Sequence, residues 1–344
     1  MTRRQPGRVV AEPVSAPDGL AIVEDEDMQE PSCQSSGSGR RAPPREVALR
    51  QVGLVVHPTR ALETALGELR AWASAHGLMV GQVPVSGQTR QVADPVAAAA
   101  CDLLLGIGGD GTALSALHAA APTSRPVLGI ACGSIGVLTS VSVERIAWAL
   151  DEIATGRWTP VAIPGLDVTW GEAQTAVAIN DVALIRDGSG QIMVSIALDD
   201  VLYAELAGDG VVVATALGSG AYTMAAGGPL LAPGAEGMAV TPLSTHGGSC
   251  PPLVAGPRSH VTLRVQPGHA GVRCELDGRR SPVEGNLLTI RHRRHYATLV
   301  TLDGEEPRLT GLRRRGLVRD SPRVVVRGSR WGAEADRPRG AWAS

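Results

Sequence analysis

Residues 101–121 most strongly constrain the fold, because an apolar run, a glycine-rich turn and a helical segment follow one another there. The run Cys101–Leu105 has the length of a buried strand. The turn reads GIGGDGT over 106–112, and Ala113–Ala121 consists of good helix formers. A strand, a glycine turn and a helix in this order present backbone N–H groups, with about +0.5 charge at the helix start, to an anion. The sequence therefore predicts a phosphate-binding turn.

Asp110 is the residue of this turn that phosphate binding does not explain, since a carboxylate repels phosphate. A carboxylate beside phosphates suits metal coordination or removal of a proton from an attacking hydroxyl. The alternative is that Asp110 only caps the helix, because Asp is a favoured N-cap residue. We expect Asp110 to coordinate a metal or to remove a proton, and helix capping remains the alternative at this point.

Apolar runs with strand length alternate with amphipathic segments up to Gly156. The expected strands are 51–56, 78–85, 103–106 and 126–131, and the expected helices are 61–76, 94–100, 113–121 and 144–155. This alternation predicts an α/β fold with a doubly wound, mostly parallel sheet. Ligands of such sheets bind outside the carboxyl ends of the strands. The glycine turn and a second glycine loop at 132–139 both lie at that edge.

After Gly156 the pattern changes to short alternating apolar runs separated by turns such as Asp187-Gly188, Asp199-Asp200 and Asp277-Gly278. The expected strands are 166–169, 175–179, 182–185, 191–198, 201–207, 211–214, 259–266, 272–276, 286–292 and 297–302. We therefore expect four regions. They are a disordered tail (1–46), an α/β nucleotide domain (47–156), a β-rich second domain (157–303) and an arginine-rich segment (304–344) that packs back on the first domain and has a disordered end.

Charge and composition exclude several function classes. The net charge of −2 gives no reason to expect nucleic acid as a partner. No apolar run reaches the roughly 18 residues of a membrane span, and the N-terminus lacks the apolar core of a signal peptide, so we expect a cytoplasmic protein without a membrane partner. Every basic residue among the 32 Lys and Arg is Arg, so a phosphate clamp has to use Arg, backbone N–H groups or a metal. The five cysteines are widely spaced, and no metal-ligand cluster is recognisable.

A second group of residues points to a flat ligand such as a base and a ribose. Small residues and glycines are dense at 208–210, 215–222 and 226–229, where they let a backbone wrap closely around such a ligand. Upstream, Asn180-Asp181 combines an amide, which donates and accepts, with a carboxylate, which only accepts. By itself this pair is more typical of a turn that enters a strand.

Seven motifs together resemble the ATP-dependent NAD kinases in order and spacing. They are GGDGT (108–112), the loop 129–138, ND (180–181), GDG (208–210), TALGSGAY (215–222), AGGP (226–229) and TPLSTHGGS (241–249). The resemblance covers roughly residues 50–305. GGDGT also occurs in lipid kinases, whereas the later block is much more specific to NAD kinases.

The resemblance implies a kinase that transfers the γ-phosphate of ATP, or a phosphate of polyphosphate, to the 2′-hydroxyl of the adenosine ribose of NAD, with Mg²⁺. Asp110 would be the catalytic carboxylate that activates or orients this hydroxyl. The implied phosphate-turn residues are Gly108, Gly109, Gly111 and Thr112, and the implied dinucleotide residues are Asn180, Asp181, Asp209, Leu217, Gly220, Ala221 and Tyr222. His246 matches a family histidine, for which we expect a structural role. Homo-oligomers are usual in this family, so we also expect a homo-oligomer.

This chain departs from the family pattern on the NAD side. Asp181 replaces the usual Glu, Leu217 and Gly220 replace hydroxyl residues, and Pro251 replaces an Arg. Leu217 cannot make the hydrogen bond of a Thr, which can leave a polar group unpaired at a cost of about 1–3 kcal/mol. Two alternatives therefore stand beside NAD kinase: a weakly active or inactive NAD(P)-binding paralogue with a regulatory role, and a GGDGT lipid kinase.

Overall fold

The computed structural model describes residues 49–171, 174–269, 271–281, 285–304, 308–314 and 316–321. The predicted N-terminal tail and the end of the arginine-rich segment lie outside these residues.

The first half of the chain contains the predicted parallel sheet. Its strands pair in the order β2-β1-β3-β4, every neighbouring pair is parallel, and the short β5 pairs with β4. The bounds are β1 (Gln51–Val56), β2 (Met79–Gln82), β3 (Leu103–Gly108), β4 (Pro126–Ala131) and β5 (Val141–Ser142). The doubly wound α/β arrangement expected from the alternating pattern is confirmed.

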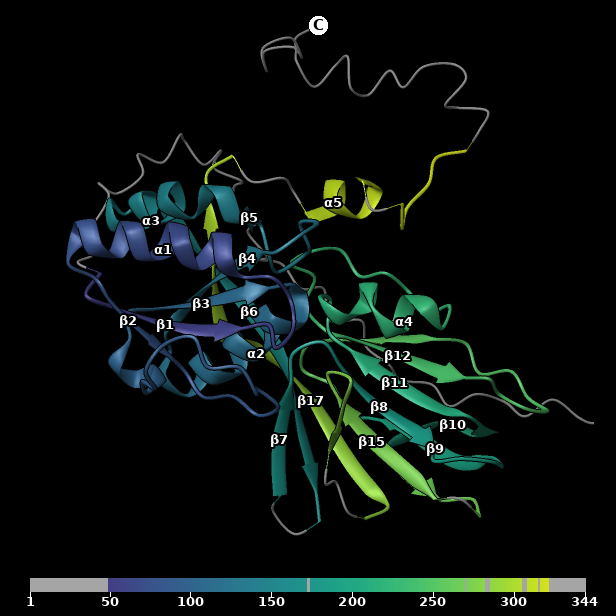
Figure 1. Ribbon diagram of the computed structural model, residues 1–344. Coiled ribbons are helices and arrows are strands. Elements are labelled where there is room, and N and C mark those ends of the chain that lie inside the picture. The colour runs from purple at the N-terminus through teal and green to yellow at the C-terminus, as the bar shows by residue number, and fades with distance from the viewer. Residues whose placement is uncertain are drawn as a thin grey trace, which may run out of the picture. The chain divides into compact units, whose positions relative to one another are not determined.

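Helices cover both faces of this sheet (Figure 1). The helices α1 (Glu63–His76) and α3 (Ile146–Ala154) lie together on one face, and α2 (Asp110–Ala120) covers the other. Gly77 ends α1 in the left-handed conformation that glycine tolerates (φ 64°). A predicted helix at 94–100 is wrong: only the 3₁₀ turn Ala98–Ala100 forms, because the backbone on either side of Pro95 is hydrogen-bonded to Gln82 of β2.

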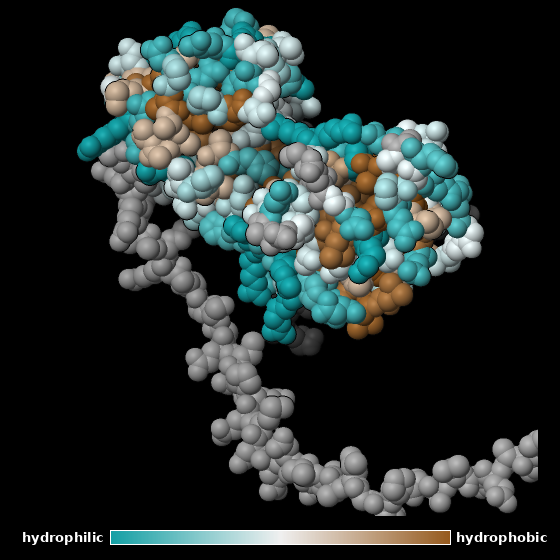
Figure 2. Space-filling view, turned by 90° about the horizontal axis from the view of Figure 1, so that it is seen from below, coloured by the Kyte–Doolittle hydropathy of each residue, from teal (hydrophilic) through white to brown (hydrophobic). Residues whose placement is uncertain are grey.

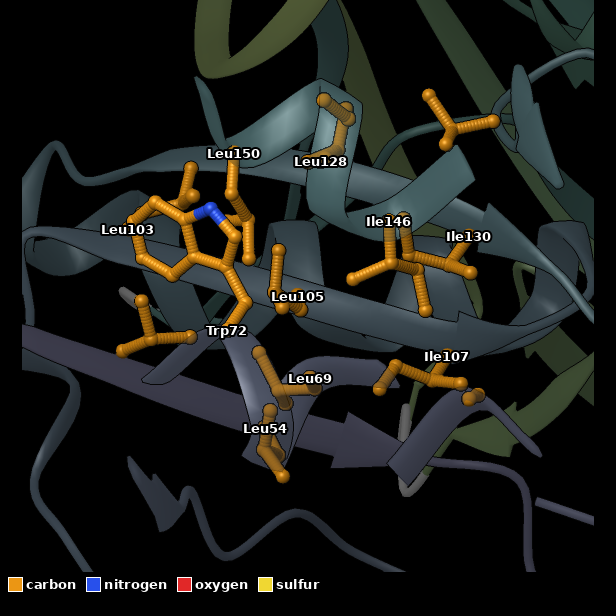
Figure 3. Packing of buried hydrophobic residues seen from close by; sticks show 14 of the residues in the cluster. Leu54, Leu69, Trp72, Leu103, Leu105, Ile107, Leu128, Ile130, Ile146 and Leu150 are labelled. Carbon is orange, nitrogen blue, oxygen red and sulfur yellow. The ribbon is translucent and has the colours of Figure 1, made fainter. Parts of the chain in front are cut away.

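The core between the sheet and α1 and α3 is built from large aliphatic side chains around one indole ring (Figure 3). Leu54, Leu105 and Ile107 project from the strands, and Leu150 and Trp72 come from the helices. The Trp72 Nε1 donates to Asp151 Oδ1 at 2.8 Å, so the buried ring also satisfies its polar atom. This packing holds the carboxyl ends of the strands, where both glycine loops lie.

The long strand β17 (Leu287–Leu302) joins this sheet to the second half of the chain. Its last part is parallel to β4, through the pairs Thr298–Pro126 and Leu299–Val127, and its first part is antiparallel to β14. The sequence predicted two strands here. The structure has one strand, with a register shift against β6 between Arg293 and Ala297. Pairing with neighbouring strands keeps the chain extended on both sides of this polar segment.

The second half is β-rich, as predicted. Beyond β17 the first sheet continues through β14, β9 and β10, and β6 pairs with both β17 and β7. A separate sheet has the order β13-β12-β11-β8-β15-β16. The bounds are β6 (Trp158–Trp170), β7 (Gln174–Ala178), β8 (Asp181–Arg186), β9 (Ile192–Leu198), β10 (Val201–Gly208), β11 (Gly210–Ala214), β12 (Met238–Leu243), β13 (Leu253–Ala255), β14 (His260–Gln266), β15 (Val272–Leu276) and β16 (Arg279–Ser281). The two sheets share one core of Val, Leu and Ile side chains. Two short helices complete the described chain, α4 (Tyr222–Ala225) and α5 (Arg308–Arg314).

Two of the predicted turns have the backbone of tight hairpin turns. Asp199 and Asp200 connect β9 to β10, and Asp277 and Gly278 connect β15 to β16, with positive φ at all four residues. The strands β5, β12, β13 and β16 were not predicted. On the surface, hydrophobic residues appear in patches between hydrophilic ones (Figure 2). No helix within the described ranges is long and apolar enough to cross a membrane.

Candidate functional site

Asp110 stands at the carboxyl end of β3, as the first residue of α2. It lies between two glycine loops, because its own GGDGT turn follows β3 and the loop 132–139 follows the neighbouring strand β4. The loops therefore meet at the edge of the sheet where the sequence placed them.

The Asp110 side chain is held by the second loop. Val137 N–H donates to its Oδ2 at 2.8 Å, Leu138 N–H donates to its Oδ1 at 2.9 Å, and the Thr139 hydroxyl donates to Oδ1 at 3.2 Å. The N-cap residue of α2 is Gly109, without a side-chain cap bond. The alternative that Asp110 only caps its helix is therefore wrong: the carboxylate bridges two loops.

Gly136 shows how closely the second loop approaches this carboxylate. A Cβ atom at Gly136 would lie 2.0 Å from Asp110 Oδ1, a distance that no side chain permits. A glycine at 136 is thus a condition for the observed position of Asp110.

On one side of Asp110 lies a cavity of about 450 Å³, which we call the apolar pocket. Asn180, Leu217, Gly220 and Ala221 of the predicted dinucleotide residues line it together with Asp110. Leu230, Leu231, Pro233 and Leu312 add apolar surface, the last from α5. A mostly apolar cavity with a few polar groups suits a base and a ribose.

The apolar pocket also contains polar groups that the sequence did not single out. Arg294 pairs with Glu236 at 2.9 Å, and both line the pocket. His292 lines it as well, and its two ring nitrogens are buried without a hydrogen-bond partner among the described residues. Burial lowers the pKa of His292, which favours the neutral ring.

Close packing of glycine fixes Asn180 in this pocket. A Cβ atom at Gly218 would lie 2.0 Å from the Asn180 carbonyl oxygen, and the same oxygen accepts the Thr215 N–H at 2.9 Å. The small residues of 215–222 therefore serve close approach of two backbone segments, as well as access for a ligand.

On the other side of Asp110 lies a more open cavity of about 520 Å³, which we call the arginine pocket. Gly109, Gly111 and Thr112 line it with Asp110, and so do Arg60 and Arg279. Arg60 Nη1 donates to the Cys132 carbonyl oxygen at 2.6 Å, and Arg279 Nη2 donates to Ser115 Oγ at 2.5 Å. Two guanidinium groups and the N-terminus of α2 make this pocket suitable for an anion.

Asp209 and Tyr222 line a third cavity, the outer pocket, with Arg186 and Arg273. The Arg186 Nε lies 2.5 Å from Asp209 Oδ1, and this hydrogen bond holds the pKa of the Asp209 carboxyl below its usual range. Burial raises the pKa of the Tyr222 phenol. The structure thus places these two predicted residues together in a pocket other than the apolar pocket.

Two predicted residues line none of these three pockets. Gly108 is the buried last residue of β3. Asp181 begins β8 and is 6% exposed. Burial and the neighbouring carboxylates Asp277 and Glu275 raise the pKa of Asp181 to about 7.

No group of three His, Cys, Asp or Glu side chains that could hold a metal ion occurs in the part of the chain that the structure describes. Asp110 is the only carboxylate among the described residues that line the arginine pocket.

Sequence reasoning missed Arg60, Arg279 and His292. For Arg60 a signal existed, since it follows β1 at the same edge of the sheet as the glycine turns. Arg279 lies in β16, which the sequence did not indicate, and His292 lies in β17; only the fold brings these two residues to a pocket.

Comparisons with known proteins agree with the geometry. Residues 52–158 match the ATP-NAD kinase N-terminal domain, and residues 179–301 match the ATP-NAD kinase C-terminal domain. An NAD kinase of Nocardia farcinica is 34% identical over 274 residues, which are 70% of this chain and 84% of that protein. An NAD kinase of Chlorobaculum tepidum is 30% identical over 72% of this chain and 90% of that protein.

Two solved structures have the same fold. Yeast NADH kinase complexed with NADH superimposes with a TM-score of 0.67 and 19% identity, covering 79% of this chain and 89% of that one. An NAD kinase from Archaeoglobus fulgidus in complex with ATP has a TM-score of 0.61 and 21% identity, covering 76% and 96%.

Proposed function

The chain belongs to the ATP-NAD kinase family, and on this premise we propose that it makes NADP by transferring the γ-phosphate of ATP to the 2′-hydroxyl of the adenosine ribose of NAD. The lipid kinase alternative does not agree with this membership, since both family domains match.

The observation that carries the proposal is that Asp110 lines two pockets of different chemistry. The arginine pocket suits the phosphates of the donor, and the apolar pocket suits the adenosine half of the acceptor. A phosphate and a hydroxyl brought to the two sides of one carboxylate are arranged for direct transfer.

In this mechanism the carboxylate of Asp110 accepts the proton of the 2′-hydroxyl or orients this hydroxyl toward the γ-phosphate. The donors at Val137, Leu138 and Thr139 keep the carboxylate in place before the substrates arrive. Asn180 lies in the same pocket, with an amide that can donate to and accept from the ribose.

On the donor side, Arg60 and Arg279 neutralise phosphate charge. Mg²⁺ suits this arrangement, because it prefers oxygen ligands and usually keeps several waters beside one or two carboxylates and the substrate phosphates. Asp110 would be its protein ligand, and the metal would supply further charge neutralisation when it is bound.

The test is NADP formation by the purified full chain with Mg²⁺ and either ATP or inorganic polyphosphate. We expect NADP with ATP, measured by a cycling assay specific for NADP. Binding of NAD without NADP from either donor would favour the regulatory paralogue instead.

Replacing Arg279 by Gln should show that the two pockets bind different substrates. The variant loses one charge-assisted contact to the donor, so we expect the KM for ATP to rise about tenfold and the KM for NAD to change less than about twofold. Arg280→Gln is the matched control, since its guanidinium pairs with Asp187 on the surface and should change neither constant. A rise in the KM for NAD alone in Arg279→Gln would contradict the assignment of the arginine pocket to the donor.

The four regions, the cytoplasmic location, the homo-oligomer and the roles of Asp181, Asp209 and Tyr222 in holding NAD stay predictions.

A further inference from the structure

The turn between β15 and β16 contains a buried carboxylate that the mechanism above does not use. Asp277 has φ 53° and Gly278 has φ 71°, so the chain reverses in two residues. The Asp277 side chain points into the protein and is only 4% exposed. A carboxylate buried to this degree needs partners, because removal from water is costly.

The first partners of Asp277 are the backbone N–H groups around Asn180. Asp277 Oδ2 accepts the N–H of Ile179 at 2.9 Å, and its Oδ1 accepts the N–H of Asn180 at 2.6 Å and that of Asp181 at 3.2 Å. In return, the Asp277 N–H donates to the Asp181 carbonyl oxygen at 2.9 Å. One turn thus holds three consecutive residues of the segment that enters β8.

The other partner comes from the helix that begins with Asp110. His118 lies about two turns further along α2, and its Nε2 is 2.7 Å from Asp277 Oδ2. The Nδ1 of His118 is 3.2 Å from the Tyr296 hydroxyl, which orients the ring. Asp277 therefore connects the catalytic helix to the backbone of Asn180.

These contacts act on a residue that is confined from the opposite side as well. Gly218 packs against the Asn180 carbonyl oxygen, and the Thr215 N–H donates to the same oxygen. On the other side, the Asn180 N–H donates to Asp277. Both backbone groups of Asn180 are thus held, at a residue that lines the apolar pocket.

We propose that Asp277 is a positioning residue of the kinase: through three backbone N–H groups and His118 it sets the position of Asn180 relative to Asp110, and so the affinity for the ribose of NAD. The proposal rests on the proposed function for its kinetic part. Its structural part, the restraint of residues 179–181, does not depend on turnover.

The experiment compares Asp277→Asn with Asp199→Asn. Asp199 offers a matched control, because it also sits in a hairpin turn with positive φ, accepts a backbone N–H at 2.9 Å and lies 3.3 Å from a histidine ring, at His260. Asn tolerates this backbone conformation, so both turns should keep their shape. In Asp277→Asn one carboxylate oxygen becomes an N–H₂ group, which cannot accept a hydrogen bond: in place of Oδ2 it faces the Ile179 N–H, and in place of Oδ1 it faces the N–H groups of Asn180 and Asp181.

For Asp277→Asn we expect the KM for NAD to rise about tenfold or more, the KM for ATP to stay within about twofold, and the amides of 179–181 to exchange hydrogen at least about tenfold faster. Asp199→Asn should change none of these. His118→Leu removes the helix contact without touching the turn, so it serves if Asp277→Asn does not fold, and a smaller rise in the KM for NAD is expected.

Equal changes in both KM values, or unchanged exchange at 179–181 in Asp277→Asn and in His118→Leu, would overturn the proposal. Absence of NADP formation by the unaltered chain would refute the proposed function instead. Hydrogen exchange would in that case still decide whether Asp277 restrains the segment.

Discussion

Replacing Asp110 by Asn is expected to lower the kcat for NADP formation by about 10²–10⁴, the range that a positioned acid–base group contributes. The neutral amide cannot take the proton of the ribose hydroxyl. In addition, the Asn N–H₂ group would face either the Val137 or the Leu138 N–H, so a donor meets a donor where the carboxylate accepted. We therefore also expect faster hydrogen exchange in residues 136–139.

Thr139→Val is the control for the loss of hydrogen bonds between Asp110 and the loop 136–139. It removes the 3.2 Å hydroxyl contact and leaves the charge of Asp110 unchanged, so kcat should fall by less than about tenfold. Steady-state kinetics and hydrogen exchange on both variants separate chemistry from loop order. An Asp110→Asn protein with a kcat within about tenfold of the unaltered chain would refute the catalytic role.

Replacing Asp181 by Asn is expected to stabilise the fold at alkaline pH and to weaken NAD binding. Burial and two nearby carboxylates raise the pKa of Asp181 to about 7, against about 3.9 in an unfolded chain. Below pH 4 Asp181 is protonated in the folded and in the unfolded chain, so it does not lower the unfolding free energy. As the pH rises from 4 through 7, the unfolded chain releases this proton first, and the unfolding free energy of the unaltered chain falls. Asn carries no charge to bury, so the variant should gain up to about 4 kcal/mol at pH 8 and almost nothing at pH 4.

The measurement is the unfolding free energy of both proteins at several pH values between 4 and 8, together with the KM for NAD at pH 8. Asp200→Asn is the control, since the Asp200 side chain is 87% exposed and should give no gain that depends on pH. A gain independent of pH would contradict the buried charge. An unchanged KM for NAD would contradict the predicted contact of Asp181 with the dinucleotide.

The parts of the fold that follow from local sequence were predicted well. The bounds of β1 and β4 agree residue for residue with the expected strands, because each apolar run is delimited by polar or turn-forming residues. The Asp199-Asp200 and Asp277-Gly278 turns follow equally from residues that accept positive φ. The errors occur where distant pairing decides: Gln82 keeps the segment around Pro95 extended, and neighbouring strands keep β17 continuous.

The candidate site divides in the same way. Motifs alone indicated Asp110, Asn180, Leu217, Gly220 and Ala221, and the structure brings these five to one pocket. They did not indicate that Asp209 and Tyr222 line a different pocket, or that Asp181 lines none of the three. Which pocket a residue lines depends on where its strand ends relative to the neighbouring strands.

The sequence by itself therefore determined the strand–turn–helix unit at Asp110, the family and the glycines that allow close approach, since these depend on residue type and short spacing. The tertiary structure alone decided what the Asp110 carboxylate contacts, that Arg60 and Arg279 line the same pocket as Asp110, and that Asp277 holds Asn180. The physical reason is separation along the chain: Asp277 and Asn180 are 97 residues apart, and Arg279 and Ser115 are 164 apart. Hydrogen bonds of this range leave no periodic pattern in the sequence, because each joins two elements whose positions are set by the packing of the whole sheet.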